Sequence, residues 1–278
     1  VEAKAEIADS DEVNGLRFRA GAILANEIGD LDGAIDRFER VVEDDASDEA
    51  AREALEGLLD DEGQRVRVAL ILEHVHRSRG DVPALIAVME RRLSTVAEPQ
   101  ERRDILIRIA ELSEEGLSNS QAAFEVYGRA LTEDPADERI HSELDRLGAT
   151  LSATEALVDL YAARLDDIYD MDLGRRLNLK LARMLEDILE DDPRAEQHYR
   201  LALDAGGDEL EPLEALDRVL ERQQKWDDLL EILERRIQAV TGAGEQAELY
   251  YRSGQIRARE HGDQDGAFGA YRAALEQS

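Results

Sequence analysis

The chain has 278 residues, of which 43% are hydrophobic and 36% charged but only 4% aromatic. This composition is too apolar for a disordered acidic tail, and its abundance of Ala, Leu, Glu and Arg argues against a β-protein. The formal net charge of −31 disfavours nucleic acid and anionic membrane surfaces as partners. It is compatible with a basic partner, or with a solvated surface that has no partner. The chain has no cysteine, which excludes disulfides, zinc–thiolate sites and cysteine nucleophiles.

The first predicted unit begins near residue 16 and contains helical segments separated by a turn at Gly29-Asp30. Its small, aromatic and aliphatic residues recur later in the chain at a spacing of 89, and they are Gly21, Ala34, Phe38 and Val42. Later units recur at a spacing of 72, so 17 extra residues follow Leu59. Residues 64–78 within them predict one additional helix, and their apolar run 68–72 is too short to span a bilayer.

Three further units begin near 105, 177 and 249 and align with one another without gaps. The same residue classes recur in each copy, as Ala123, Ala195 and Ala267; Tyr127, Tyr199 and Tyr271; and Leu131, Leu203 and Leu275. Self-similarity at a fixed period predicts a repeat architecture. Each unit of 72 residues is long enough for two helical hairpins.

The local pattern within a unit is helical. Leu177, Leu181, Leu185 and Ile188 form one apolar stripe with the spacing of an α-helix. Prolines mark the starts of new segments, as first-turn prolines do, at Pro83, Pro99, Pro135, Pro193 and Pro212. We expect about fifteen helices, mostly of 11 to 17 residues, and no strand.

Residues 29–38 resemble the turn and second helix of the tetratricopeptide repeat (TPR) family, with small Ala34 and aromatic Phe38 at the family's intervals. The segment of Ala123, Tyr127 and Pro135 is similar, and the copies at Ala195 and Ala267 keep the alanine and tyrosine. The first helices lack the family's Trp-Leu-Gly pattern. The resemblance implies an all-α fold, an α-solenoid of stacked antiparallel hairpins in a right-handed superhelix. It implies one solenoid over residues 1–278, with aromatic rings filling the space between successive hairpins.

Candidate chemistry is sparse. His74 and His76 are two residues apart on a predicted helix, so they point to different faces and cannot share a metal ion. Asp30-Leu31-Asp32-Gly33 and Asp263-Gln264-Asp265-Gly266 imitate half of a calcium loop, but no oxygen ligand stands two residues earlier. Phosphate-loop, dinucleotide and serine-hydrolase motifs are absent. We therefore expect no catalytic residues, no metal and no cofactor.

One recurrence suggests a site. Arg19, Arg108, Lys180 and Arg252 hold the same place in the four units, on the first helix of a hairpin. In the family frame that place lines the concave groove, where a row of cations could bind acidic groups of a peptide. The alternative is a set of structural ion pairs with neighbouring acids. A second row, Arg92, Arg164 and Arg236, has the same two interpretations.

The leading functional hypothesis is a non-catalytic scaffold or adaptor that binds a protein or peptide, with no nucleic acid and no direct membrane insertion. The alternatives are a sensor or regulatory arm of a larger multidomain enzyme or signalling protein, and a structural spacer in a larger assembly. Residues 1–7 align with the end of the helix that precedes Gln246, and neither end carries a polar capping helix. We therefore expect the chain to be a piece of a longer array.

Overall fold

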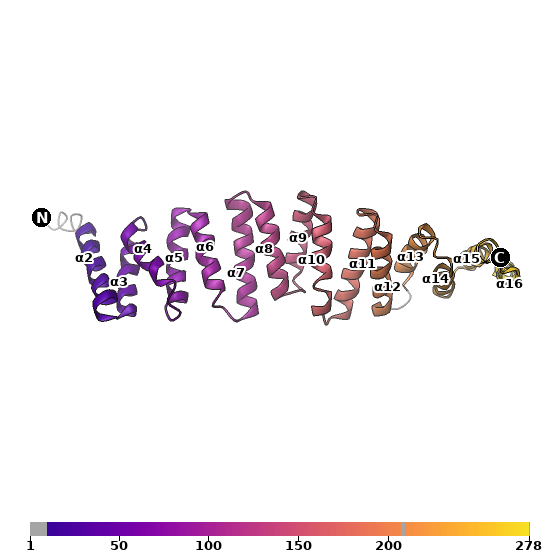
Figure 1. Cartoon of the computed structure of the whole chain (residues 1–278), viewed down its shortest axis with the longest axis horizontal. Coiled ribbons are helices and arrows are strands. Elements are labelled where there is room, and N and C mark those ends of the chain that lie inside the picture. The colour runs from indigo at the N-terminus through magenta and orange to yellow at the C-terminus, as the bar shows by residue number, and fades with distance from the viewer. Residues whose placement is uncertain (1–9, 207–208, 278) are drawn as a thin grey trace. The chain divides into compact units, whose positions relative to one another are not determined.

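The computed structural model describes residues 10–206 and 209–277, which form fifteen α-helices joined by short turns (Figure 1). Within these described residues there is no strand. The predicted all-α fold class, and the prediction of about fifteen helices, are confirmed. The chain divides into two compact units between Leu147 and Gly148. The expectation of one continuous solenoid that belongs to a longer array stays a prediction.

The first unit consists mainly of antiparallel hairpins, in which α2 packs against α3, α5 against α6 and α7 against α8. Short π-helical turns, η1 (Leu24–Ile28) and η2 (Leu112–Gly116), extend α2 and α7. The helices are α2 (Ser10–Ile23), α3 (Leu31–Asp44), α4 (Glu49–Leu58), α5 (Arg65–Arg79), α6 (Val82–Leu93), α7 (Pro99–Glu111), α8 (Ser120–Glu133) and α9 (Glu138–Thr150), the last of which contains the unit boundary. Helix α5 occupies the residues for which an additional helix was predicted, and it is preceded by α4.

The second unit repeats this arrangement, with α11 packed against α12, α13 against α14 and α15 against α16. The short 3-10 turn η3 (Leu165–Asp167) follows α10. The helices are α10 (Thr154–Ala162), α11 (Met171–Asp187), α12 (Asp192–Gly206), α13 (Leu210–Arg222), α14 (Trp226–Ala239), α15 (Ala243–Arg259) and α16 (Gln264–Gln277). Successive hairpins also contact each other within the unit, through α12 with α13 and through α14 with α15.

The Gly-Asp turns predicted from the sequence end one helix and start the next. Gly29 and Gly262 have φ of 78° and 66°, a left-handed conformation that glycine adopts without a steric penalty. Asp30 then accepts a hydrogen bond from the backbone N–H of Gly33 at 3.0 Å, and Asp263 accepts one from Gly266 at 2.9 Å. Both aspartates are therefore helix N-caps, which accounts for the resemblance to calcium loops without a metal.

Small residues and aromatic rings interlock inside each hairpin. Gly21 on α2 lies against Phe38 on α3, where an added Cβ atom would come within 2.6 Å of the ring. Gly254 on α15 lies against Tyr271 on α16 at the same distance. Both rings thus contact the paired helix of their own hairpin, and Phe38 also belongs to a buried cluster that includes residues of the following α4 and α5. The small residue leaves room for the ring on the paired helix, so the two residue types recur together in the repeat.

Candidate partner-binding surface

The structure places the four predicted partner-binding cations on the first helices of four hairpins: Arg19 on α2, Arg108 on α7, Lys180 on α11 and Arg252 on α15. The side chain of Arg19 is exposed, and no acid among the described residues lies within ion-pair distance of it. The side chain of Arg108 is 46% exposed, and its Nη1 donates to Glu111 on the same helix at 2.9 Å. These two cations in the first unit are accessible to solvent.

The two cations in the second unit already have internal partners. Lys180 Nζ donates to the hydroxyl of Tyr161 at 3.3 Å and lies 4.5 Å from the centre of its ring. Arg252 Nη2 lies 2.6 Å from Asp217 Oδ1 and 2.8 Å from Glu221 Oε2. The side chain of Asp217 is only 3% exposed, so this ion pair is largely removed from water. Arg252 thus shows the structural ion pair that was the alternative interpretation, and the partner-binding role of the row stays a prediction.

Two arginines of the second row, Arg92 and Arg236, contact buried acids that the sequence interpretation did not single out, whereas Arg164 lies near the exposed Asp167. Arg236 forms an ion pair with Asp217, and Arg92 Nε lies 3.2 Å from Glu73 Oε1. Both arginine side chains are 13% exposed. The acids could have been found from the sequence, because residues 73, 145 and 217 are all acidic and recur at the repeat spacing, 19 residues before each arginine of the row.

Glu73 is not fully compensated by its arginine. The Arg92–Glu73 contact is short, but neither atom in it makes a hydrogen bond of good geometry. Burial therefore raises the pKa of Glu73, and the attraction of Arg92 and Arg77 only partly opposes that rise. A carboxylate in this position is held by packing of its helix rather than by strong pairing.

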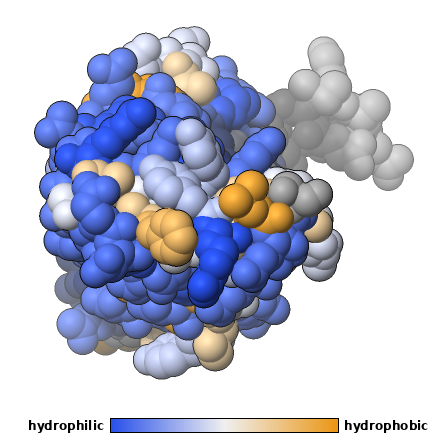
Figure 2. All heavy atoms as spheres, turned by 90° about the vertical axis from the view of Figure 1, so that its right-hand side faces the viewer, coloured by the Kyte–Doolittle hydropathy of each residue, from blue (hydrophilic) through white to orange (hydrophobic). Residues whose placement is uncertain are grey.

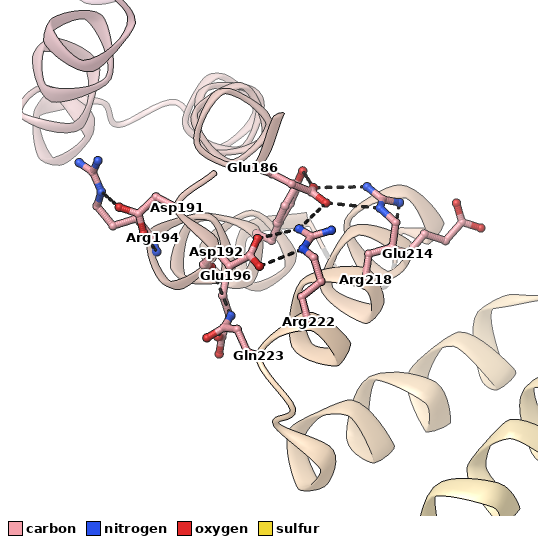
Figure 3. A network of polar contacts seen from close by, with 10 residues as sticks. Glu186, Asp191, Asp192, Arg194, Glu196, Glu214, Arg218, Arg222 and Gln223 are labelled. Carbon is pink, nitrogen blue, oxygen red and sulfur yellow. Dashed lines mark hydrogen bonds and ion pairs between the residues drawn. The ribbon is translucent and has the colours of Figure 1, made fainter. Parts of the chain in front are cut away.

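A denser polar network joins α11, α12 and α13 in the second unit (Figure 3). Glu186 accepts a hydrogen bond from the hydroxyl of Tyr199 at 2.8 Å and from Arg222 Nη2 at 2.9 Å. Arg218 donates to the same carboxylate at 3.3 Å, and Arg222 also contacts Asp192 at 2.6 Å. Burial alone would raise the pKa of Glu186, but these hydrogen bonds outweigh it and lower the pKa. The network fixes the hairpin α11/α12 to the next helix.

Two ion pairs occupy equivalent positions of the repeat with their charges exchanged. In the first unit Arg139 on α9 pairs with Glu111 on α7. In the second unit, 72 residues later at both positions, Glu211 on α13 pairs with Arg183 on α11. Each pair joins a helix to the second helix after it in the chain, so the same link is made with opposite polarity.

Apolar side chains are exposed on the last hairpin, α15/α16. Tyr251, Phe268 and Leu275 are 54%, 70% and 76% exposed. Figure 2 shows hydrophobic side chains among hydrophilic ones at the C-terminal end of the molecule. Between the two helices lies an open hollow of about 390 Å³, lined by Ala247, Glu248, Tyr251, Tyr271, Ala274 and Leu275.

The polar residues of the described segments are not arranged for metal chemistry. Of the two neighbouring histidines, His76 is buried and His74 is exposed, as expected for residues on different faces of α5. No group of three or more His, Asp or Glu side chains in the described residues comes together as a metal site would require. In the same residues, no helix combines the length and the apolar character that crossing a membrane requires.

One segment of the chain matches a known repeat family. Residues 213–248 match the tetratricopeptide repeat family model, and this range covers most of α13, all of α14 and the start of α15. A search of curated protein sequences gave no significant match.

Several solved structures are similar to the chain. A tetratricopeptide repeat protein from Parabacteroides merdae has 14% identity and a TM-score of 0.30, over 96% of this chain and 94% of that one. The pilF protein of Pseudomonas aeruginosa has 14% identity and a TM-score of 0.34, over 75% and 90%. The C-terminal part of a TPR repeat-containing protein from Cytophaga hutchinsonii has 9% identity and a TM-score of 0.34, over 87% and 98%. The match at 213–248 thus identifies one tetratricopeptide-like repeat in the second unit, on the hairpin of α13 and α14.

Proposed function

We propose that the protein is a non-catalytic scaffold that binds a protein or peptide partner on the exposed faces of its hairpins. The observation that carries this proposal is the placement of Arg19 and Arg108. They hold the same position in successive repeat units, and both side chains are exposed on first helices. Cations at regular spacing suit acidic groups along an extended or helical segment.

The four cations differ in what binding would require of them. Arg19 and Arg108 are accessible, whereas Lys180 would have to leave Tyr161 and Arg252 would have to leave the buried Asp217. Breaking a pair with a buried carboxylate is costly, and Asp217 would keep only Arg236 of its two compensating cations. Arg19 and Arg108 should therefore contribute most, and Arg252 least.

The test is a charge reversal at the accessible pair. Each exposed contact with an acidic group should contribute about 0.5–1 kcal/mol and weaken with salt. The double variant Arg19→Glu/Arg108→Glu should therefore weaken binding of a fluorescein-labelled, glutamate-rich dodecapeptide by about tenfold or more, as measured by anisotropy. The matched control reverses Arg183, an exposed arginine outside the row that pairs with Glu211.

The readouts separate folding from binding. The double variant should keep the circular dichroism spectrum and melting temperature of the unaltered protein, because neither side chain is buried. Binding that is unchanged in the double variant, or weakened equally by Arg183→Glu, would exclude this row as the site. Either result would place any binding of the acidic peptide outside this row.

A further inference from the structure

A second surface lies in the first unit, between α3 and α5. The hollow there, called the α3/α5 hollow below, has a volume of about 400 Å³ and is lined by Glu39, Val42, Glu43, Arg67, Leu70, Ile71, His74 and Val75. Val42, Ile71 and Val75 are buried and form an apolar floor. Leu70 lies at the edge with half of its side chain exposed. The exposed half of Leu70 and the floor of the hollow thus form one apolar surface that is open to solvent.

The repeat itself shows that Leu70 is unusual. Helices α5, α9 and α13 share one register, in which Leu72, Leu144 and Leu216 are each fully buried. In that register Leu70 corresponds to Ser142 on α9 and to Glu214 on α13, and both of these side chains are exposed to water. The repeat therefore places a polar residue at this exposed position in its other copies. Only α5 among these three helices carries an aliphatic side chain there.

The hollow forms where the repeat is interrupted. Two helices, α4 and α5, follow α3, whereas a single helix, α9, stands between α8 and α10. Both α4 and α5 contact α3. The face of α5 that carries Leu70 and Ile71 thus lies beside α3, the second helix of the preceding hairpin. The two helices do not close on each other there, and an open space remains between them.

The rim of the hollow carries uncompensated negative charge. Arg67 already forms ion pairs with three carboxylates. Its guanidinium nitrogens lie 2.5 Å from Asp36, 3.0 Å from Glu39 and 3.7 Å from Asp32. Glu43 is exposed, and no cation among the described residues lies within ion-pair distance of it. A basic group that entered the hollow would therefore find a free carboxylate next to an apolar floor.

We propose that the α3/α5 hollow binds a short segment of a partner protein that carries an aliphatic or aromatic residue close to a lysine or arginine. The apolar residue contacts Leu70 and the floor, and the basic residue pairs with Glu43. The volume is near the lower end of the range of about 300–1,000 Å³ for small-molecule sites, which suits a few side chains rather than a whole domain. This inference rests on the proposed role in peptide binding, but it uses a different surface and the opposite partner charge.

The experiment selects the ligand class without assuming a sequence. A phage-displayed library of random decapeptides is panned on the protein after depletion on the Leu70→Ser variant, which carries the residue of the equivalent position Ser142. Enriched peptides should combine a Lys or Arg with a Leu, Ile, Phe or Met within a few residues. Their affinity is then measured by fluorescence anisotropy with synthetic, labelled copies.

The variants give distinct expectations. Leu70→Ser should weaken binding of an enriched peptide by about tenfold, as expected when one leucine contact is lost. Glu43→Gln should weaken it several-fold and reduce its dependence on salt. The matched control is Leu201→Ser, because Leu201 on α12 is 42% exposed and lies outside the hollow. This control, like Arg19→Glu/Arg108→Glu, should leave binding of these peptides unchanged.

Three results would overturn the inference: no enrichment above the depleted background, enriched peptides without basic residues, or affinities that neither Leu70→Ser nor Glu43→Gln changes. None of these results bears on the proposed role of Arg19 and Arg108, because that role is tested with an acidic peptide and with other variants. Conversely, failure of the acidic-peptide test would not contradict the proposed role of the α3/α5 hollow. Glu43→Gln keeps the test valid even if Leu70→Ser alters the packing of α5, since Glu43 is exposed on α3.

Discussion

The two units differ in how they compensate the charge of a buried glutamate. Glu73 on α5 is 6% exposed and Glu186 on α11 is 8% exposed. Glu73 has one arginine at contact distance without an aligned hydrogen bond, whereas Glu186 receives hydrogen bonds from Tyr199, Arg218 and Arg222. The pKa of Glu73 is raised because burial dominates. The pKa of Glu186 is lowered because its three donors outweigh burial.

The comparison indicates that the number of donors, rather than the depth of burial, decides whether a buried acid stabilises the fold. The donors of Glu186 come from two neighbouring helices, α12 and α13, so its network holds successive elements together. The ion pair of Glu73 reaches only α6, the partner of α5 in its own hairpin, among the residues that the structure describes. The region around α5 also contains the α3/α5 hollow, so it is less completely tied to its neighbours.

The largest expected effect comes from removing the hub of the network. Glu186→Ala leaves the buried hydroxyl of Tyr199 without its acceptor and removes one acceptor from each of Arg218 and Arg222, and should lower the free energy of unfolding by about 2 kcal/mol. The value is discounted because Arg218 and Arg222 are 57% and 46% exposed and can turn to water. Urea unfolding followed by circular dichroism measures it. Asp204→Ala, an exposed acid on α12, is the control and should change stability by less than about 0.5 kcal/mol.

A smaller difference is expected at two buried histidines. His198 on α12 is hydrogen-bonded to Asn178 at 2.9 Å, whereas neither ring nitrogen of His76 on α5 makes a hydrogen bond. At neutral pH, His198→Leu should therefore cost about 1 kcal/mol, because it leaves the amide of Asn178 without this partner. His76→Leu should be neutral or stabilising, since an apolar side chain replaces an unsatisfied buried one. Equal losses of stability in His198→Leu and His76→Leu would contradict the proposed difference between the two histidines.

The smallest effect is a difference in pH dependence. Glu186 has a lowered pKa in the folded state, so its contribution is present above the ordinary value of 4.5 and is lost as pH falls through the folded pKa. Glu73 has a raised pKa, so its contribution is present below 4.5 and is lost as pH rises through the folded pKa. Glu186→Gln should therefore flatten the loss of stability in acid, and Glu73→Gln should make stability rise more with pH above 4.5. Urea midpoints measured across the acid range test both signs, and a shared sign would refute the comparison.

Much of the fold could be predicted from the sequence because its determinants are local. Prolines near helix starts, Gly-Asp turns and apolar stripes each act over a few residues, and Pro99 and Asp30 mark helix starts in the structure. The packing partner of each aromatic ring could not be read in the same way. Phe38 and Gly21 are conspicuous in the repeat, but their contact depends on how two helices dock.

The candidate site was less predictable, because its contacts also depend on how helices dock. Recurrence identified Arg19, Arg108, Lys180 and Arg252 as equivalent, yet it could not show that Arg252 is held by an acid 35 residues earlier. That contact depends on the stacking of successive hairpins. The α3/α5 hollow depends on how α5 lies against α3, and the spacing of residues alone does not contain that information.

The exchanged ion pairs, Arg139–Glu111 and Glu211–Arg183, have a consequence for folding fidelity. Neighbouring repeats of similar sequence can mispair while they fold, because each helix meets several surfaces of nearly the same shape. If α9 docked on α11, Arg139 would face Arg183, and if α13 docked on α7, Glu211 would face Glu111. Like charges repel in either wrong arrangement, whereas both correct ones join opposite charges. The exchanged polarity of these two pairs thus disfavours both mispaired arrangements.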